Sequence, residues 1–303
     1  MPLAKDIWRP AIVSAPIEAI WAAGSIAPFP LTWLPPMERP YSFLADPFGL
    51  WRDGHLHIFV ETYDYRVHIG AIEVLTYDRG LRLIDRAPAL AEPWHLSYPQ
   101  VFEAEGETWM LPEAARSGGL TLYRARDFPT RWEPAGRIAL DHVPIDATPL
   151  FHEGRWWLFY TSADAEADKM AALNISFADR LSGPWTSHPA NPVRVDRGSA
   201  RPGGTARLIE GRVVLPVQDC RATYGGAIRP LAFSRLDPAH AEAHAGAPIL
   251  PPATCAPFTR GLHTLAAAGP VTLVDMKRKA LGPRGLAIQL NRRLRRPTGR
   301  PKP

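Results

Sequence analysis

The sequence predicts an all-β protein, and more specifically a five-bladed β-propeller. Three observations support this prediction: a hairpin pattern that recurs along the chain, a spacing of about fifty residues between its copies, and many turn formers between short apolar runs. Proline (33 residues) and glycine (23 residues) are abundant, while hydrophobic residues make up 46% of the 303 residues. That combination is typical of sandwiches, barrels and propellers.

The repeat is clearest in three segments that align without gaps. They read DPFGLWRDGHLHIFVE from Asp46, YPQVFEAEGETWMLPE from Tyr98 and DATPLFHEGRWWLFYT from Asp146. Each has a glycine eight residues after its start, then an apolar strand. A looser copy begins near Arg201 and a faint one near residue 261. About four strands per period indicate propeller blades, whereas a two-sheet sandwich does not explain the regular spacing.

We therefore expect one propeller over residues 1–280, with blades that start near 46, 98, 146, 201 and 261. The N-terminal segment around RPAIVSA is expected to add a closing strand to the last blade. Residues 281–303 form a predicted basic tail. From Lys277 onward there are ten Lys/Arg residues and no acid, so the net charge of +5 belongs to this end.

The basic tail has two interpretations, a solvated terminus or a contact with an anionic surface. It has no aromatic side chain for base stacking, which argues against nucleic acid as a partner. The two cysteines, Cys220 and Cys255, have no metal-ligand spacing and predict no disulfide framework. No signal peptide or membrane-spanning run is apparent, so we expect a cytoplasmic protein. No metal-ligand constellation stands out in the sequence, and we expect no cofactor and no metal.

Polar residues recur at equivalent repeat positions and predict a site at one mouth of the propeller channel. First strands begin there and second strands end there, so their polar ends converge. The residues concerned are Asp46, Tyr98, Asp146 and Arg201 from first strands, Glu61, Glu113, Gln218 and Asp219 from second strands, and His95 and His263 nearby. Singly, each is as easily structural; Asp46, for example, precedes a proline. Together they favour a function, because converging carboxylates raise one another's pKa and provide the acid and base of glycoside hydrolysis.

The motifs FLADPF, HLSYPQVFEAEGETWMLPE, DATPLFHEGRWWLFY, GPWTSHPANPV, ARPGG, QDCRATYGGAI and GLHTL also carry a family resemblance. In this order, from about residue 42 to 279, the sequence resembles the N-terminal propeller domain of plant glucosamine inositolphosphorylceramide transferases. That domain is in turn similar to the five-bladed propellers of family 43 and family 32 glycoside hydrolases. The resemblance implies that Asp46 acts as base or nucleophile and that Asp146 tunes the site.

The resemblance also implies a glutamate acid at the start of blade four, where this sequence has Arg201. Glu113 is the substitute acid that we expect from its position. Arg201, with Arg221 and His263, would instead hold an anionic group. The other residues expected to contact substrate are Glu61, His95, Tyr98, Gln218, Asp219 and Tyr224. Two functions stay open: a carbohydrate-active enzyme that cleaves or transfers a glycosyl unit, and a non-catalytic glycan-binding propeller that serves a glycosyltransferase. The expected partner in both is a carbohydrate or sugar-containing substrate.

Overall fold

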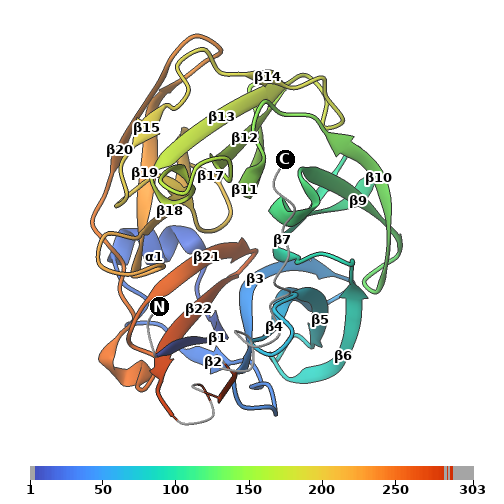
Figure 1. The fold of residues 1–303 in the computed structure, drawn as a ribbon, viewed down its shortest axis with the longest axis vertical. Coiled ribbons are helices and arrows are strands. Elements are labelled where there is room, and N and C mark those ends of the chain that lie inside the picture. The colour runs from blue at the N-terminus through green and yellow to red at the C-terminus, as the bar shows by residue number, and fades with distance from the viewer. Residues whose placement is uncertain (1–3, 283–284, 286, 289–303) are drawn as a thin grey trace, which may run out of the picture.

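The computed structural model of the protein describes residues 4–282, 285 and 287–288. Five sheets stand in a ring around a central axis, which confirms the predicted five-bladed β-propeller (Figure 1). No helix in this described part is long and apolar enough to cross a membrane. Cys220 and Cys255 are buried free thiols. The predicted tail, residues 281–303, lies almost wholly outside the described residues.

Each blade is an antiparallel sheet whose strands run outwards from the axis in chain order. Blade one consists of β3 (Ser42–Arg52), β4 (His55–Asp64), β5 (Ala71–Tyr77) and β6 (Leu83–Leu90), and blade two of β7 (Ser97–Ala104), β8 (Glu107–Glu113), β9 (Leu120–Asp127) and β10 (Arg131–Ile138). Blade three consists of β11 (Pro144–His152), β12 (Arg155–Ser162), β13 (Ala172–Ala178), β14 (Thr186–Ser187) and β15 (Arg194–Val195). Blade four consists of β16 (Arg201–Pro202), β17 (Arg207–Ile209), β18 (Arg212–Asp219), β19 (Ala227–Leu236) and β20 (Ala241–Ala245).

Blade five joins the two ends of the described chain. Its inner strands are β21 (Leu262–Ala268) and β22 (Val271–Ala280), and its outer strands are β1 (Lys5–Val13) and β2 (Leu31–Trp33). β1 pairs with β22 over its whole length, from Lys5 opposite Ala280 to Val13 opposite Thr272. The predicted closing strand is therefore confirmed, and its hydrogen bonds leave no open edge where the ring meets itself. The segment between β1 and β2 contains α1 (Ile17–Ala23), which the sequence analysis did not anticipate.

The repeated glycines form the turns between the first two strands of the blades. In blade one, Asp53 and Gly54 have φ of 50° and 78° and connect Arg52 to His55. The same acidic residue and glycine, both with positive φ, recur in blades two, three and four as Glu105-Gly106, Glu153-Gly154 and Glu210-Gly211. Two consecutive positive φ angles define the two-residue hairpin turn that matches strand twist. The sequence repeat thus reflects a backbone requirement of the turn.

A β-bulge interrupts the first strand of blades one, two, three and five at the same place. The register shifts between Ala45 and Phe48, between Ser97 and Gln100, between Ile145 and Thr148, and between Leu262 and Thr264. We call the residue directly after the last regular pair the bulge slot; its occupants are Asp46, Tyr98, Asp146 and His263. The first three have φ of 48°, 48° and 51°, a left-handed conformation that is uncommon outside glycine. Such bulges re-aim side chains and are frequent beside functional sites.

Apolar side chains fill the spaces between neighbouring blades and hold this arrangement in place. Trp157 and Phe159 of blade three, for example, pack with Leu215 of blade four, and all three are buried. Burying one such side chain contributes roughly 1.5–3 kcal/mol. The bulge slots are therefore supported by packed walls on both sides.

Candidate functional site

The register brings second-strand residues next to the bulge slots. In blades one, two, three and five, the residue that precedes the bulge slot pairs with a fixed position on the second strand, which we call the partner slot. The equivalent position in blade four is Gln218, which pairs with Arg201. The pairs are Ala45 with Glu61, Ser97 with Glu113, Ile145 with Thr161, Arg201 with Gln218, and Leu262 with Met276. Arg201 is thus level with Ala45 and Ser97, one residue before the bulge slot, and not equivalent to Asp46 as the sequence repeat suggested. The pairing of Arg201 with Gln218 is not visible in an ungapped alignment.

Asp46 is a buried carboxyl with defined hydrogen bonds. Its Oδ2 accepts from the backbone N–H of Tyr98 at 3.2 Å, and its Oδ1 accepts from the Thr264 hydroxyl at 3.2 Å. His263 Nε2 lies 3.6 Å from Oδ1. Burial raises the pKa of Asp46 to about 7, although His263 opposes this shift. A carboxyl that titrates near neutral pH is suited to proton transfer.

His263 lies between two carboxylates, one of which the sequence analysis missed. Asp275, fully buried on β22, has its Oδ1 2.6 Å from His263 Nδ1, and its Oδ2 accepts from the backbone N–H of Asp46 at 2.8 Å. Burial lowers the pKa of His263, but Asp275 and Asp46 outweigh burial and raise it. A single charged residue in the apolar run VTLVDM was the available signal for Asp275.

The same three residues have the ligand types that could bind a metal ion. Ligand atoms of Asp46, His263 and Asp275 all lie within 4.8 Å of one another. Carboxylate oxygens and an imidazole nitrogen suit several divalent ions. A cation bound through His263 Nδ1 would displace the contact of that nitrogen with Asp275. The hydrogen bonds among Asp46, His263 and Asp275 explain their proximity without a metal ion. The expectation that no metal binds here stays a prediction.

Asp146 is joined to blade four by a buried ion pair. Arg201 Nε donates to Asp146 Oδ2 at 2.7 Å, and Gln218 Nε2 donates to the same oxygen at 3.1 Å. Only 5% of the Asp146 side chain and 10% of the Arg201 side chain are exposed. Burial opposes the charge of Arg201, yet Asp146 outweighs it and raises the guanidinium pKa. Asp146, Arg201 and Gln218, predicted separately from two blades, therefore form one unit.

Glu113 has hydrogen-bond donors on both carboxyl oxygens. The Ser97 hydroxyl donates to Oε2 at 2.9 Å, and the backbone N–H of Ala115 donates to Oε1 at 2.8 Å. Burial raises the pKa of Glu113, while these two donors lower it. Both donors come from blade two itself, so Glu113 is held by local structure.

Glu61 occupies the equivalent slot of blade one with fewer contacts. Its carboxyl accepts no hydrogen bond from the residues that the structure describes; the nearest charged-type contact is His95 Nε2, 3.5 Å from Oε1. Only 9% of the Glu61 side chain is exposed. Burial, together with Asp46 and Glu113, raises its pKa well above the ordinary value. His95 itself is neutral at pH 7, because burial and Arg116 lower its pKa to about 4.

Tyr98 connects three blades through its hydroxyl. The backbone N–H of Gly204 donates to the Tyr98 oxygen at 2.6 Å, and the Thr148 hydroxyl lies 3.0 Å from it. Its side chain is fully buried. These contacts account for the residue structurally, and its predicted contact with substrate stays a prediction.

Asp219 and Arg221 form a separate ion-pair group at the end of β18. Asp219 Oδ2 accepts from Arg221 at 2.5 Å and from Arg229 at 3.0 Å. Burial alone would raise the pKa of Asp219, but hydrogen bonds from Arg221 and Arg229 lower it to about 2. Asp219 and Arg221 also line an open hollow of about 930 Å³ together with Arg260 and Lys279. The structure therefore pairs Asp219 with two arginines, and its predicted contact with substrate stays a prediction.

Aromatic rings enclose His263, and one of them was missed by the sequence analysis. Trp8 of β1 stacks on the imidazole with ring centroids 3.6 Å apart, and Tyr224 contacts it edge-on at 5.3 Å. The guanidinium of Arg201 lies 5.1 Å from the Tyr224 ring centre. The buried ammonium of Lys277 donates to the Tyr224 backbone carbonyl and so anchors its loop. Trp8 and Lys277 were not predicted as part of the site. They reach it because β1 pairs with β22 in blade five, a contact between the two ends of the described chain.

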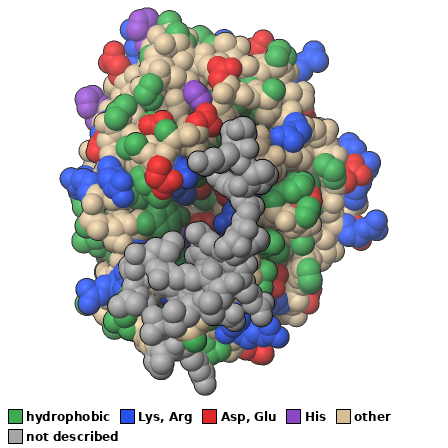
Figure 2. All heavy atoms as spheres, in the orientation of Figure 1, with side chains coloured by type: hydrophobic (Ala, Val, Ile, Leu, Met, Phe, Trp, Pro, Cys, Tyr) green, Lys and Arg blue, Asp and Glu red, His purple; other side chains and the backbone are tan. Residues whose placement is uncertain are grey.

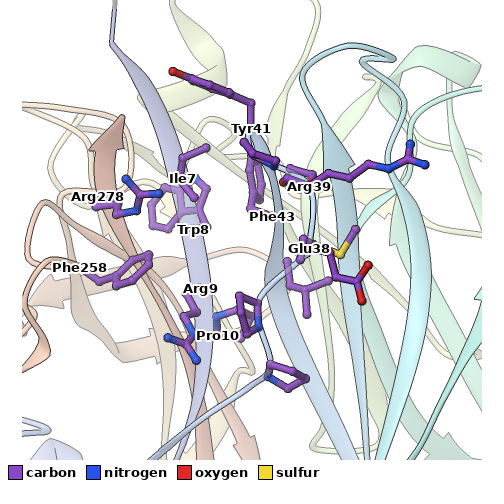
Figure 3. Close-up of a pocket in the computed structure, with 16 residues that line it drawn as sticks. Ile7, Trp8, Arg9, Pro10, Glu38, Arg39, Tyr41, Phe43, Phe258 and Arg278 are labelled. Atoms are coloured by element: carbon purple, nitrogen blue, oxygen red, sulfur yellow. Dashed lines mark hydrogen bonds between the residues drawn. The ribbon is translucent and has the colours of Figure 1, made fainter. Parts of the chain in front are cut away.

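A side pocket of about 250 Å³ lies behind Trp8, between β1 and the segment that leads into β3. In Figure 3, Trp8, Phe258 and Arg278 lie on one side of it, and Glu38 and Arg39 on the other. Figure 2 shows acidic and basic side chains scattered over the face viewed there and not gathered in one patch.

The fold and the cluster define a class: a five-bladed β-propeller whose channel end carries buried carboxylates from several blades. Residues 31–243, more than half of the chain, match the family described as glucosamine inositolphosphorylceramide transferase 1, N-terminal. The protein belongs to this family. The glucosamine inositolphosphorylceramide transferase 1 of Oryza sativa subsp. indica is 36% identical over 212 residues, which cover 68% of this chain and 28% of that protein.

The Arabidopsis thaliana protein of the same name is 37% identical over 196 residues, which cover 63% of this chain and 25% of that protein. The chain thus matches little more than a quarter of the length of these relatives. Among solved structures, a family 117 glycoside hydrolase from Zobellia galactanivorans aligns with a TM-score of 0.57 at 14% identity, covering 80% of this chain and 87% of that one. An α-L-arabinofuranosidase from Podospora anserina aligns with a TM-score of 0.57 at 12% identity, covering 81% and 93%. At this identity the likeness establishes the fold.

Proposed function

We propose that the protein is a carbohydrate-active enzyme that cleaves or transfers a glycosyl unit at the channel mouth. The observation that carries the proposal is the group of buried carboxyls in neighbouring bulge and partner slots, Asp46, Glu61 and Glu113, each with a raised pKa. Perturbed carboxyls of this kind cluster at functional sites. The names of the family relatives, which mention glucosamine transfer, and of the glycosidases that share the fold support a carbohydrate substrate.

Asp46 is the proposed base or nucleophile. Its pKa of about 7 leaves a substantial ionised fraction at neutral pH. Asp146, fixed by Arg201, orients or tunes the site. The proton donor is one of the two partner-slot glutamates, Glu61 or Glu113.

The substrate would contact the polar groups around these carboxyls. They are the predicted binding residues His95, Tyr98, Gln218, Asp219 and Tyr224, with Arg201, Arg221 and His263 for an anionic part. Arginine suits carboxylate or phosphate recognition because its planar fork donates two parallel hydrogen bonds.

A non-catalytic glycan-binding role is the second candidate, and one observation favours it. Arg201 stands where the wider resemblance implies a glutamate acid, and its charge is neutralised by Asp146. The relatives are much longer than this chain, so a propeller that presents a glycan to a separate transferase domain fits their length.

A panel of aryl glycosides, oligosaccharides and sugar phosphates separates the two functions. Wild type, Asp46→Asn and the exposed control Asp85→Asn would be assayed for turnover and, by calorimetry, for binding. We expect turnover by wild type and the control, and a loss on the order of 10²–10⁴-fold in Asp46→Asn. Turnover that survives in Asp46→Asn would remove Asp46 from the mechanism. Binding without turnover would select the second candidate, and neither binding nor turnover would contradict both.

A further inference from the structure

Two glutamates occupy the same slot of successive blades, but their surroundings differ. Glu61 ends β4 beside Ala45, and Glu113 ends β8 beside Ser97, each as a regular antiparallel pair. The bulge slot follows Ala45 and Ser97 in turn. Because the backbone is equivalent, differences between the two carboxyls come from their neighbouring groups.

Glu113 is surrounded by donors. The Ser97 hydroxyl and the Ala115 N–H each donate to one of its oxygens. Donors on both oxygens stabilise a carboxylate more than a carboxylic acid, because an acid needs one oxygen to carry and donate its own proton. Glu113 is therefore arranged as a structural acceptor that ties the end of β8 to the turn after it.

Glu61 lacks both kinds of donor. Its cross-strand neighbour Ala45 has no hydroxyl, and no backbone N–H in the described chain donates to it. The carboxyl is more than nine-tenths buried and lies on the strand adjacent to Asp46, whose negative charge disfavours a second anion. Burial without donors stabilises the protonated form and leaves the acid proton free to be given away.

His95 is oriented towards Glu61 by a backbone contact. The N–H of Gly70 donates to His95 Nδ1 at 2.8 Å, so the neutral ring carries its proton on Nε2, which is 3.5 Å from Glu61 Oε1. A Cβ at Gly70 would lie 2.8 Å from both Glu61 Oε1 and His95 Cε1, so glycine is required for this approach. The Nε2–H is placed to stabilise Glu61 once it has become a carboxylate.

We propose that Glu61, and not Glu113, is the proton donor of the channel-mouth site, with His95 as its positioning residue. The inference rests on the proposed glycosyl-cleaving or glycosyl-transferring function. It replaces the sequence-based preference for Glu113 because the partner slots are equivalent and, among the described residues, Glu113 accepts two hydrogen bonds whereas Glu61 accepts none.

The proposed step balances with water or a sugar hydroxyl as acceptor. The bond between the anomeric carbon and the leaving oxygen breaks, its electron pair stays on that oxygen, and the oxygen takes the proton of Glu61. Asp46 either takes the proton of the attacking hydroxyl, or attacks the anomeric carbon first and is then displaced by that hydroxyl, whose proton passes to the Glu61 carboxylate. Glu61 then accepts a hydrogen bond from His95 Nε2 until it regains a proton.

The protonation state can be tested without any substrate. In protein labelled with ¹³C at the glutamate side-chain carboxyls, we expect one resonance at pH 7 to have the shift of a buried carboxylic acid. Glu61→Gln should remove that resonance and Glu113→Gln should retain it. The opposite pattern would overturn the inference and leave the proposed function standing. A carboxylate shift for both glutamates at pH 7 would overturn it as well.

Leaving-group dependence then tests catalysis on a glycoside that the wild type turns over. Glu61→Gln should lower kcat on the order of 10²–10⁴-fold with a poor leaving group and much less with an activated aryl leaving group, whereas Glu113→Gln should lower both equally and slightly. Equal losses from the two variants would contradict the role of Glu61. If the wild type turns over no glycoside, the proposed function fails while the resonance still reports which glutamate is protonated.

A milder pair of variants guards against loss of folding. Ala45→Ser should supply Glu61 with the hydroxyl that Ser97 supplies to Glu113, and should reduce the acid form of Glu61 at pH 7. His95→Gln should leave the resonance present but shift the basic limb of the activity profile. An unchanged resonance in Ala45→Ser, with the variant folded, would contradict the argument from hydrogen-bond donors.

Discussion

Blades one and two have the same backbone at the channel mouth and use it for different purposes. Their bulge slots hold Asp46 and Tyr98 with an identical φ of 48°. Asp46 keeps a carboxyl with a pKa of about 7, whereas the Tyr98 hydroxyl is engaged by Gly204 and Thr148. The bulge slot of blade one therefore holds a carboxyl that titrates near neutral pH, and the bulge slot of blade two holds a hydroxyl that connects neighbouring blades.

The difference shows that the propeller supplies positions and the local donors decide their chemistry. Ser97 differs from Ala45 by a single hydroxyl group. That hydroxyl donates a hydrogen bond to Glu113, and Glu61 lacks an equivalent donor on Ala45. A glutamate at the partner slot is thus no evidence of a catalytic acid until its hydrogen bonds are known. Neighbouring groups likewise decide the state of Asp146, which forms an ion pair with Arg201.

The largest effect is expected where the comparison extends to blades three and four. Arg201→Met removes the cation that pairs with the buried Asp146, and should lower the free energy of unfolding by about 3–5 kcal/mol, measured by urea denaturation. Adding Asp146→Asn to that variant should recover much of the loss. Equal stability of Arg201→Met and wild type would mean that Asp146 does not need its partner.

Tyr98→Phe should reveal the structural use of the bulge slot in blade two. Removing the hydroxyl leaves the buried N–H of Gly204 without its acceptor, so we expect a loss of about 1–3 kcal/mol in thermal or chemical unfolding. Any retained activity should show unchanged pH dependence. A shift of the activity profile in Tyr98→Phe would place Tyr98 in contact with substrate, as the sequence analysis predicted.

The pH dependence of stability should reveal the use of the slot in blade one. The folded-state pKa of Asp46 is raised to about 7, so the folded protein binds more protons than the unfolded chain between about pH 4 and 7. Stability should therefore fall as pH rises through this window. Asp46→Asn should flatten this slope while Tyr98→Phe retains it; an unchanged slope in Asp46→Asn would contradict the assignment.

The smallest effect is expected when Ser97, the cross-strand neighbour of Glu113, is given the alanine side chain of Ala45. Ser97→Ala removes one hydrogen-bond donor from Glu113 and should raise the pKa of Glu113 further, because that donor stabilises the carboxylate. The carboxyl resonances of the labelled protein report this shift, with Glu113→Gln as the assignment control. If Glu113 titrates identically with and without the Ser97 hydroxyl, the two glutamates differ for another reason.

Much of the site was predictable because the repeat has a period that the fold must obey. Asp46, Asp146, Glu61 and Glu113 were found by aligning the hairpins, and the turns that align them require the glycines at fixed offsets. Asp275 and Trp8 escaped, because one is isolated in an apolar strand and the other lies at the opposite end of the chain. Neither position follows the repeat pattern.

The sequence by itself determined the blade count, the hairpin turns and the end of the channel at which the carboxyls gather, since each depends on local periodicity and backbone conformation. Only the tertiary structure decided which of the buried carboxyls accept hydrogen bonds from the described residues and which do not. Ring closure brings His263 between Asp46 and Asp275, the packing of blade four beside blade three places Arg201 on Asp146, and the cross-strand neighbour supplies or withholds a donor. These contacts depend on distances of a few ångströms between residues far apart in the chain, which no local pattern encodes.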